Sequence, residues 1–251
     1  MSDVTTIKNG INFASGIGTS IRPIVRLLNS SCLWAEELAQ KTHFVFLGLE
    51  LDAGALSRSF FKPIDSSIYV IKGASGWVNF DKKSWTVLKE CWDGEKEDRI
   101  FEAIAAVQHG VKTIADTAAG LRFLASIGLL TVLAPYSRGL TLIKSGFAAI
   151  ASVLKITCLV YDLLQVVKVP IKHEEDLRRQ QLAWLDDMLQ IAIQIFAFLI
   201  NAFGGCSTLF KDIIPREKLI PAVLFNIWGT GASFAGLGKI AVDYFKEPSP
   251  K

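Results

Sequence analysis

The sequence predicts an all-α fold built from long amphipathic and apolar helices. Apolar residues recur at helical spacing along most of the chain, and long uncharged stretches appear from about Glu95 onward. Hydrophobic residues make up 51% of the 251 residues, charged residues make up 20%, and the mean hydropathy is +0.36. Water-soluble globular proteins usually carry roughly a quarter charged residues. This composition therefore favours helices that lie in or against a membrane.

A change of composition near Asp93-Gly94-Glu95 divides the chain into two regions. Residues 1–94 form a mixed, more polar N-terminal region. Within it, residues 4–30 have the pattern of an amphipathic helix interrupted by Gly16, Gly18 and Pro23, and Ser31 is placed to cap a second helix. Residues 66–80 carry β-branched and aromatic residues around a glycine turn, which allows a small β-hairpin there. A helix is the alternative, because the flanking segments have helical patterns.

Residues 95–251 form an apolar helical region that we expect to associate with a membrane. Glu95 to about Leu133 is predicted to be one long helix, which Pro135 ends. Its polar residues lie within about 80° of arc at 100° per residue. They are Asp98, Glu102, His109, Lys112 and Asp116, and a solvated face is the simplest interpretation.

Residues 138–168 are predicted to form a helix that is apolar around most of its circumference. Lys144, Lys155 and Asp162 lie within about 20° of one another on it. A helix this apolar needs a large core or lipid to cover it. We interpret the charges as the wetted stripe of a helix at an interface. The alternative is an ion path, since ionisable groups in spanning helices are usually functional.

Two charge-free runs, 188–210 and 219–238, are each long enough to cross the hydrocarbon core and predict a helical hairpin. In the second run, Gly231 and Ala235, and likewise Ala232 and Gly236, are four residues apart, a pattern that lets helices pack closely in membranes. In the first, the amide residues Gln190, Gln194 and Asn201 share one side. They either form hydrogen bonds within a bundle or line a polar path.

The sequence offers no motif for catalysis, a cofactor or a metal. Cys32, Cys91, Cys158 and Cys206 lack zinc-ligand spacing, so we interpret them as reduced thiols exposed to a reducing compartment. The net charge of +3 comes from mixed signs and does not predict nucleic-acid binding. The N-terminus lacks the pattern of a cleavable signal peptide, so membrane insertion is expected to use internal segments.

The stretch Ile214-Pro-Arg-Glu-Lys-Leu219, followed by the glycine-rich run to Gly238, resembles the C-terminal end of the membrane-elongating family known as the eleventh class of peroxins. The first 95 residues depart from that family's basic amphipathic start. The architecture is also similar to that of secreted bacterial proteins that insert into host vacuole membranes. Both resemblances imply membrane association, and neither assigns site residues.

These observations together predict a non-enzymatic, membrane-associated helical scaffold or membrane-shaping protein. Its expected partners are the lipid bilayer and either further copies of the chain or partner helices. One alternative is a small transporter or channel component, in which Lys155, Asp162 and the amide residues line a path. The other is a soluble all-α interaction protein that oligomerises through its apolar helices.

Overall fold

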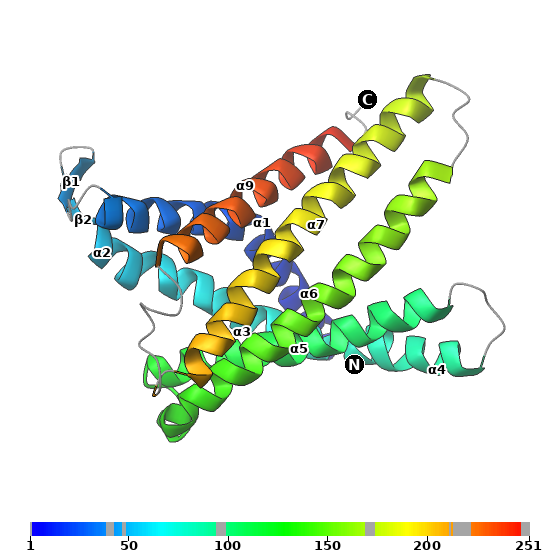
Figure 1. The fold of residues 1–251 in the computed structure, drawn as a ribbon. Helices are drawn as coiled ribbons and strands as arrows, with labels where there is room; N and C mark the ends of the chain where they lie inside the picture. Colours follow the sequence, from blue (N-terminus) through cyan, green and yellow to red (C-terminus); the bar gives the residue numbers. More distant parts are fainter. Residues whose placement is uncertain are drawn as a thin grey trace.

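The computed structural model describes residues 2–38, 43–46, 49–93, 99–168, 174–210, 212 and 222–246. It confirms the all-α class (Figure 1). The long helices are α1 (Ser2–Leu38), α3 (Lys62–Val78), α5 (Arg99–Ser126), α6 (Ser137–Lys168), α7 (Glu174–Leu209) and α9 (Ala222–Lys246). Shorter elements are α2 (Ala53–Leu56), α4 (Thr86–Asp93), two π-helical turns at Ser57–Phe61 and Asp81–Trp85, and a 3-10 segment at Thr131–Tyr136.

Helix α1 is continuous, so the predicted interruption by Gly16, Gly18 and Pro23 and the new helix at Ser31 are wrong. The hydroxyl of Ser31 donates to the Leu27 carbonyl one turn earlier, 2.9 Å away, instead of capping a helix start. Tertiary packing overrides the weak local propensities here, because most helical stability in proteins comes from packing rather than from propensity.

Of the two alternatives for residues 66–80, the hairpin is wrong and the helix is confirmed, because residues 62–78 form helix α3. Its glycines serve a close helix contact rather than a turn. A Cβ atom on Gly73 would lie 3.1 Å from the Thr117 backbone of α5, and one on Gly76 would lie 2.5 Å from the Thr113 hydroxyl. A two-stranded hairpin does occur earlier, where β1 (His43–Phe46) pairs antiparallel with β2 (Leu49–Asp52).

The described part of the long helix predicted over 95–133 is α5, which ends at Ser126 rather than at Pro135. The cause is Gly128, which adopts a left-handed φ of 81° and donates its N–H to the Ala125 carbonyl at 3.2 Å. Glycine takes this conformation without the steric penalty of a side chain, so it commonly terminates helices. Pro135 lies in the 3-10 segment that leads into α6.

Six long helices of the described chain form a closed ring. Along the chain, α5 packs on α6, α6 on α7 and α7 on α9; then α9 packs on α1, α1 on α3 and α3 on α5. In Figure 1, α6, α7 and α9 lie side by side and α1 is next to α9. The predicted division at residues 94 and 95 lies outside the described residues. Helices that precede this position in the sequence pack against helices that follow it, since α1 contacts α9 and α3 contacts α5.

Large apolar side chains lie mainly on the outside of this ring, whereas its interior is built largely from small and polar residues. Alanine, serine and cysteine account for most of the buried positions, and Asp116, Asp186 and Asn226 are also buried. Exposed apolar side chains occur on all six helices and include Phe13, Trp77, Ile100, Leu164, Met188 and Phe234. Small residues let helices approach closely in lipid, and broad exposed apolar surfaces mark contact with a membrane or with other proteins.

Two segments of the described chain, Thr131–Lys168 and Glu174–Leu209, are long and apolar enough to cross a membrane. In the most apolar 18-residue stretch of the first segment, 22% of the residues are buried, and in that of the second segment none is. The core helices of soluble proteins, in contrast, are mostly buried. The first charge-free run, 188–210, falls largely within α7. The second run, 219–238, begins outside the described residues, and its glycine-rich part in α9 is not among the two segments.

Candidate functional site

A cavity of about 430 Å³ lies inside the ring and is lined by residues from all six helices. Its wall contains more cations than carboxylates. The cations are Arg22, Arg26, Lys72, Lys112, Lys144 and Lys239, and the carboxylates are Asp116 and Asp243. Six cations against two carboxylates leave a formal excess of four positive charges. Asp65 and Asp186 pair with lining cations, and Lys246 pairs with Asp186; including these three residues leaves an excess of three.

Helical spacing brings these groups to the interior. Arg22 and Arg26 are four residues apart on α1, and Lys112 and Asp116 are four apart on α5. Residues three or four apart project from the same side of a helix. On α1 and α5, the faces that carry these pairs turn toward the interior of the ring.

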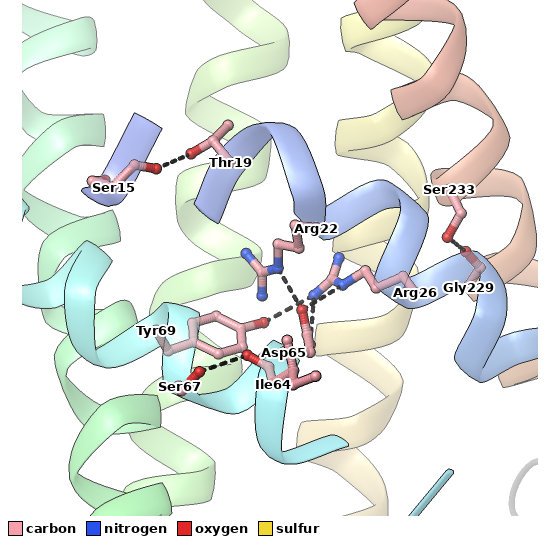
Figure 2. Close-up of polar contacts among 10 residues, drawn as sticks. All are labelled: Ser15, Thr19, Arg22, Arg26, Ile64, Asp65, Ser67, Tyr69, Gly229 and Ser233. Carbon is pink, nitrogen blue, oxygen red and sulfur yellow. Dashed lines mark hydrogen bonds and ion pairs between the residues drawn. The ribbon is translucent and has the colours of Figure 1, made fainter. Parts of the chain in front are cut away.

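An arginine–carboxylate cluster joins α1 to α3 at one side of the cavity (Figure 2). Asp65 accepts hydrogen bonds from Arg22 Nε at 2.7 Å and from Arg26 Nε at 3.1 Å. Arg26 Nη2 also donates to the Tyr69 hydroxyl at 3.1 Å, and the Arg22 guanidinium lies 4.0 Å from the centre of the Tyr69 ring. Arg22 Nη2 is buried without a hydrogen-bond partner among the described residues.

The two guanidinium groups fix Asp65 as an anion. Burial alone would raise the pKa of this carboxyl, but the charges of Arg26 and Arg22 and their hydrogen bonds hold it well below its usual range. The cluster therefore carries one net positive charge at every physiological pH. Asp65 also occupies the Nε atoms of both arginines, so neither guanidinium presents a free two-nitrogen fork through Nε.

A second group, on α3 and α5, is left without close partners. In the part of the chain that is described, no carboxylate oxygen lies within 4 Å of the Lys72 or Lys112 ammonium group. Asp116 likewise has no cationic nitrogen within 4 Å. Burial lowers the pKa of Lys72 to about 7, and the charges of Arg22 and Lys112 add to this effect, while Asp116 opposes it. These three groups line the cavity and are available to a ligand.

The opposite wall is formed by α6, α7 and α9, and its charges are better matched. Lys144 Nζ donates to Asn201 Oδ1 at 2.8 Å and so links α6 to α7. Lys239 lies 2.8 Å from Asp243 and 3.1 Å from Asp186, whose other oxygen is 2.6 Å from Lys246. The cavity-lining lysines without a carboxylate partner among the described residues are therefore Lys72 on α3, Lys112 on α5 and Lys144 on α6.

The predicted polar path is only partly brought together. Gln194 and Asn201 line the cavity, whereas Lys155, Asp162 and Gln190 are not among its lining residues. The cavity meets α6 only in its N-terminal half, between Lys144 and Ser152. Beyond that, Lys155 and Asp162 interact electrostatically with Asp187 of α7.

The predicted helix-packing residues lie on α9 where it meets α7 and α1. A Cβ atom on Gly231 would lie 2.6 Å from the Phe196 ring, and one on Gly236 would lie 2.9 Å from Pro23. Ala232 is buried and lines the cavity together with Gly236, while Ala235 is half-buried.

No sequence motif pointed to Arg22, Arg26, Asp65 and Lys72. Their spacing was the available sign, because Asp65, Tyr69 and Lys72 lie at i, i+4 and i+7 on one face of α3. Lys112 and Asp116 were interpreted as part of a solvated stripe; Lys112 is indeed exposed, whereas Asp116 is buried, and both line the cavity. No family model matches the sequence, and no curated protein or solved structure is similar to it.

Proposed function

We propose that this protein is a non-enzymatic, integral membrane protein whose ring of helices holds a small anion, as a carrier or binding component for that anion. One observation carries the proposal: a cavity with a formal excess of positive charge lies inside a ring whose exterior is apolar. Ionisable groups kept among apolar helices are costly, and they commonly mark substrate or ion pathways.

Electrostatics supports an anionic ligand. Six cations gathered around one cavity repel one another, and this repulsion is stronger in a low-dielectric interior than in water. A bound anion relieves the repulsion and gains attraction from several sides at once. A neutral or cationic ligand would leave the excess charge uncompensated.

The membrane location rests on the two apolar segments and on the exposed apolar side chains around the ring. After expression, the protein is expected to stay with membranes through high-salt and high-pH washing, because salt releases only proteins held by surface charge. Recovery in the soluble fraction without detergent would contradict the membrane assignment while leaving the cavity unaffected.

The anion-binding proposal is tested with two lysines of the same helix. Lys144 lines the cavity and Lys155 does not, although both lie on the same side of α6. Replacing either with glutamine removes one positive charge, so long-range electrostatic effects are matched. In detergent at low salt, Lys144→Gln is expected to weaken binding of a labelled anion about tenfold, since one charged hydrogen bond contributes roughly 1.5–3 kcal/mol. Lys155→Gln is expected to bind as the wild type does, and equal effects of the two changes would contradict the proposal.

The membrane-shaping scaffold is the second candidate, and helix α1 favours it. Its outer side carries a row of exposed apolar residues, Ile7, Phe13, Ile17, Ile21, Ile24 and Leu28. Such a row can insert into the headgroup region and bend a bilayer. Purified protein added to liposomes would then form tubules, and Phe13→Gln would reduce their number. Spherical liposomes at high protein density would count against this role.

A further inference from the structure

We propose that the corner of the cavity formed by α1, α3 and α5 binds the phosphate group of a small phosphate monoester. This inference rests on the proposed anion-binding function and specifies its ligand. The donors are the Arg22 guanidinium, Lys72 and Lys112, and the acceptor is Asp116; all four residues line the same cavity.

The arrangement of donors favours a tetrahedral oxyanion over a carboxylate. Carboxylates are commonly held by a planar arginine fork, which gives two parallel hydrogen bonds. Here Asp65 already accepts from the Nε atoms of Arg22 and Arg26, so neither arginine has a free fork through Nε. The remaining donors, which are the Nη1–Nη2 end of Arg22 and the ammonium groups of Lys72 and Lys112, come from three different helices. Three terminal oxygens that point in different directions suit such donors better than the two coplanar oxygens of a carboxylate.

Asp116 distinguishes phosphate from sulfate. Asp116 is 8% exposed, and its carboxylate makes neither a hydrogen bond nor an ion pair with any residue in the described ranges. A carboxylate in this place repels a fully deprotonated anion. A phosphate monoester has a second pKa of about 6, so it can take up a proton on binding and donate its P–OH hydrogen to the Asp116 carboxylate while its other oxygens accept from the cations. Sulfate is a much weaker base, stays unprotonated near neutral pH and cannot make this contact.

The rest of the cavity indicates an organic substituent on the phosphate. Small-molecule sites have volumes of roughly 300–1,000 Å³, and this cavity of about 430 Å³ falls in that range. The wall formed by α6, α7 and α9 combines aliphatic side chains, such as Ala148, Ala197 and Ile200, with polar ones, such as Gln194, Asn201 and Lys239. That wall fits a compact carbon skeleton that carries hydroxyl or other polar groups. Either a soluble phosphate ester or the headgroup of phosphatidic acid supplies this chemistry.

The test is a competition assay on the full-length protein in detergent micelles, with labelled glycerol phosphate as the probe. Unlabelled glycerol phosphate or inorganic phosphate is expected to displace it at least tenfold more effectively than sulfate or succinate. Displacement by phosphatidic acid, but not by phosphatidylcholine, would identify a lipid headgroup as the natural source. Displacement by soluble esters alone would identify a soluble ligand, and both outcomes support the phosphate site.

Variants separate this inference from the broader proposal. Lys72→Gln and Lys112→Gln are expected to weaken glycerol phosphate binding by about tenfold or more, with Lys155→Gln as the charge-matched control. Lys112 is exposed at the cavity edge, so its variant remains informative if Lys72→Gln does not fold. Asp116→Asn is expected to bring sulfate to within about threefold of phosphate, with Asp162→Asn as its control.

The phosphate inference fails if sulfate or succinate competes as well as phosphate in the wild type, or if Asp116→Asn leaves the selectivity unchanged. If succinate binds tightly and is lost in Lys144→Gln, the anion-binding function stands and only the phosphate assignment falls. If none of these anions binds at low salt, the proposed function itself is overturned.

Discussion

Replacing Asp65 with asparagine tests whether the cluster between α1 and α3 stabilises the ring. The carboxylate bridges Arg22 and Arg26 with Nε–Oδ1 distances of 2.7 and 3.1 Å. Asparagine is nearly the same size but has no charge, so the variant leaves two adjacent guanidinium groups without their counter-ion. Removing one partner from a buried ion pair costs roughly 3–5 kcal/mol.

The position of the cluster sets the expected magnitude. The side chains of Arg22, Asp65 and Arg26 are 13%, 24% and 35% exposed, so solvent weakens the interaction to the lower end of that range, about 3 kcal/mol. A change of 1 kcal/mol shifts the melting temperature of a domain of this size by roughly 2–4 °C. Asp65→Asn should therefore melt about 6–12 °C below the wild type.

The assay is thermal unfolding in detergent, followed by circular dichroism, with Asp162→Asn as the control for loss of one carboxylate. The arginines hold the pKa of Asp65 below its ordinary value of about 3.9. The stabilisation is therefore present above about pH 4 and is lost as the pH falls through the lowered pKa of the folded state. Equal melting temperatures for the two variants at pH 7 would refute this account of the cluster.

Two further predictions concern packing and the unpaired lysine. Gly231→Ala should lower the melting temperature because its new Cβ atom would lie 2.6 Å from the Phe196 ring, whereas Gly204→Ala has open space and should be neutral or stabilising; equal melting curves would show that Gly231 is not at a tight contact. Burial and neighbouring charges lower the pKa of Lys72 to about 7, below its unfolded value, so its charge destabilises the fold most below pH 7 and progressively less as the pH rises toward 10. Lys72→Gln should thus raise the melting temperature near pH 6 by more than at pH 9, and a pH-independent difference would contradict this reasoning.

The sequence was sufficient for the helical class and for many of the inward faces. Periodicity alone identified the stripe that contains Lys112 and Asp116 and the amide residues Gln194 and Asn201, all of which line the cavity. A pattern along one helix shows which residues share a face, but not which other helix covers that face. For this reason the stripe on α5 was interpreted as solvated.

Closure of the ring could not be predicted in this way. The contact between α1 and α9 joins residues about two hundred positions apart, as in the 3.1 Å hydrogen bond from Trp34 Nε1 to Thr230. Arg22, Asp65 and Lys72 each resemble an ordinary surface charge when considered singly. Only the tertiary arrangement makes them one cationic site. Gly73 and Gly76 were interpreted as turn residues because the α5 backbone that approaches them is equally invisible in the sequence.

Anomalous diffraction from crystals grown with arsenate tests the central claim, an anion site inside the ring, most directly. Arsenate has the tetrahedral shape of phosphate and carries a proton at neutral pH, and its arsenic atom can be located without a structural model of the ligand. The expected result is an arsenic peak inside the cavity, placed so that the arsenate oxygens reach Lys72 and the Arg22 guanidinium. Arsenic peaks found only on the outer surface, for example near Lys155, with none inside the cavity, would contradict the account.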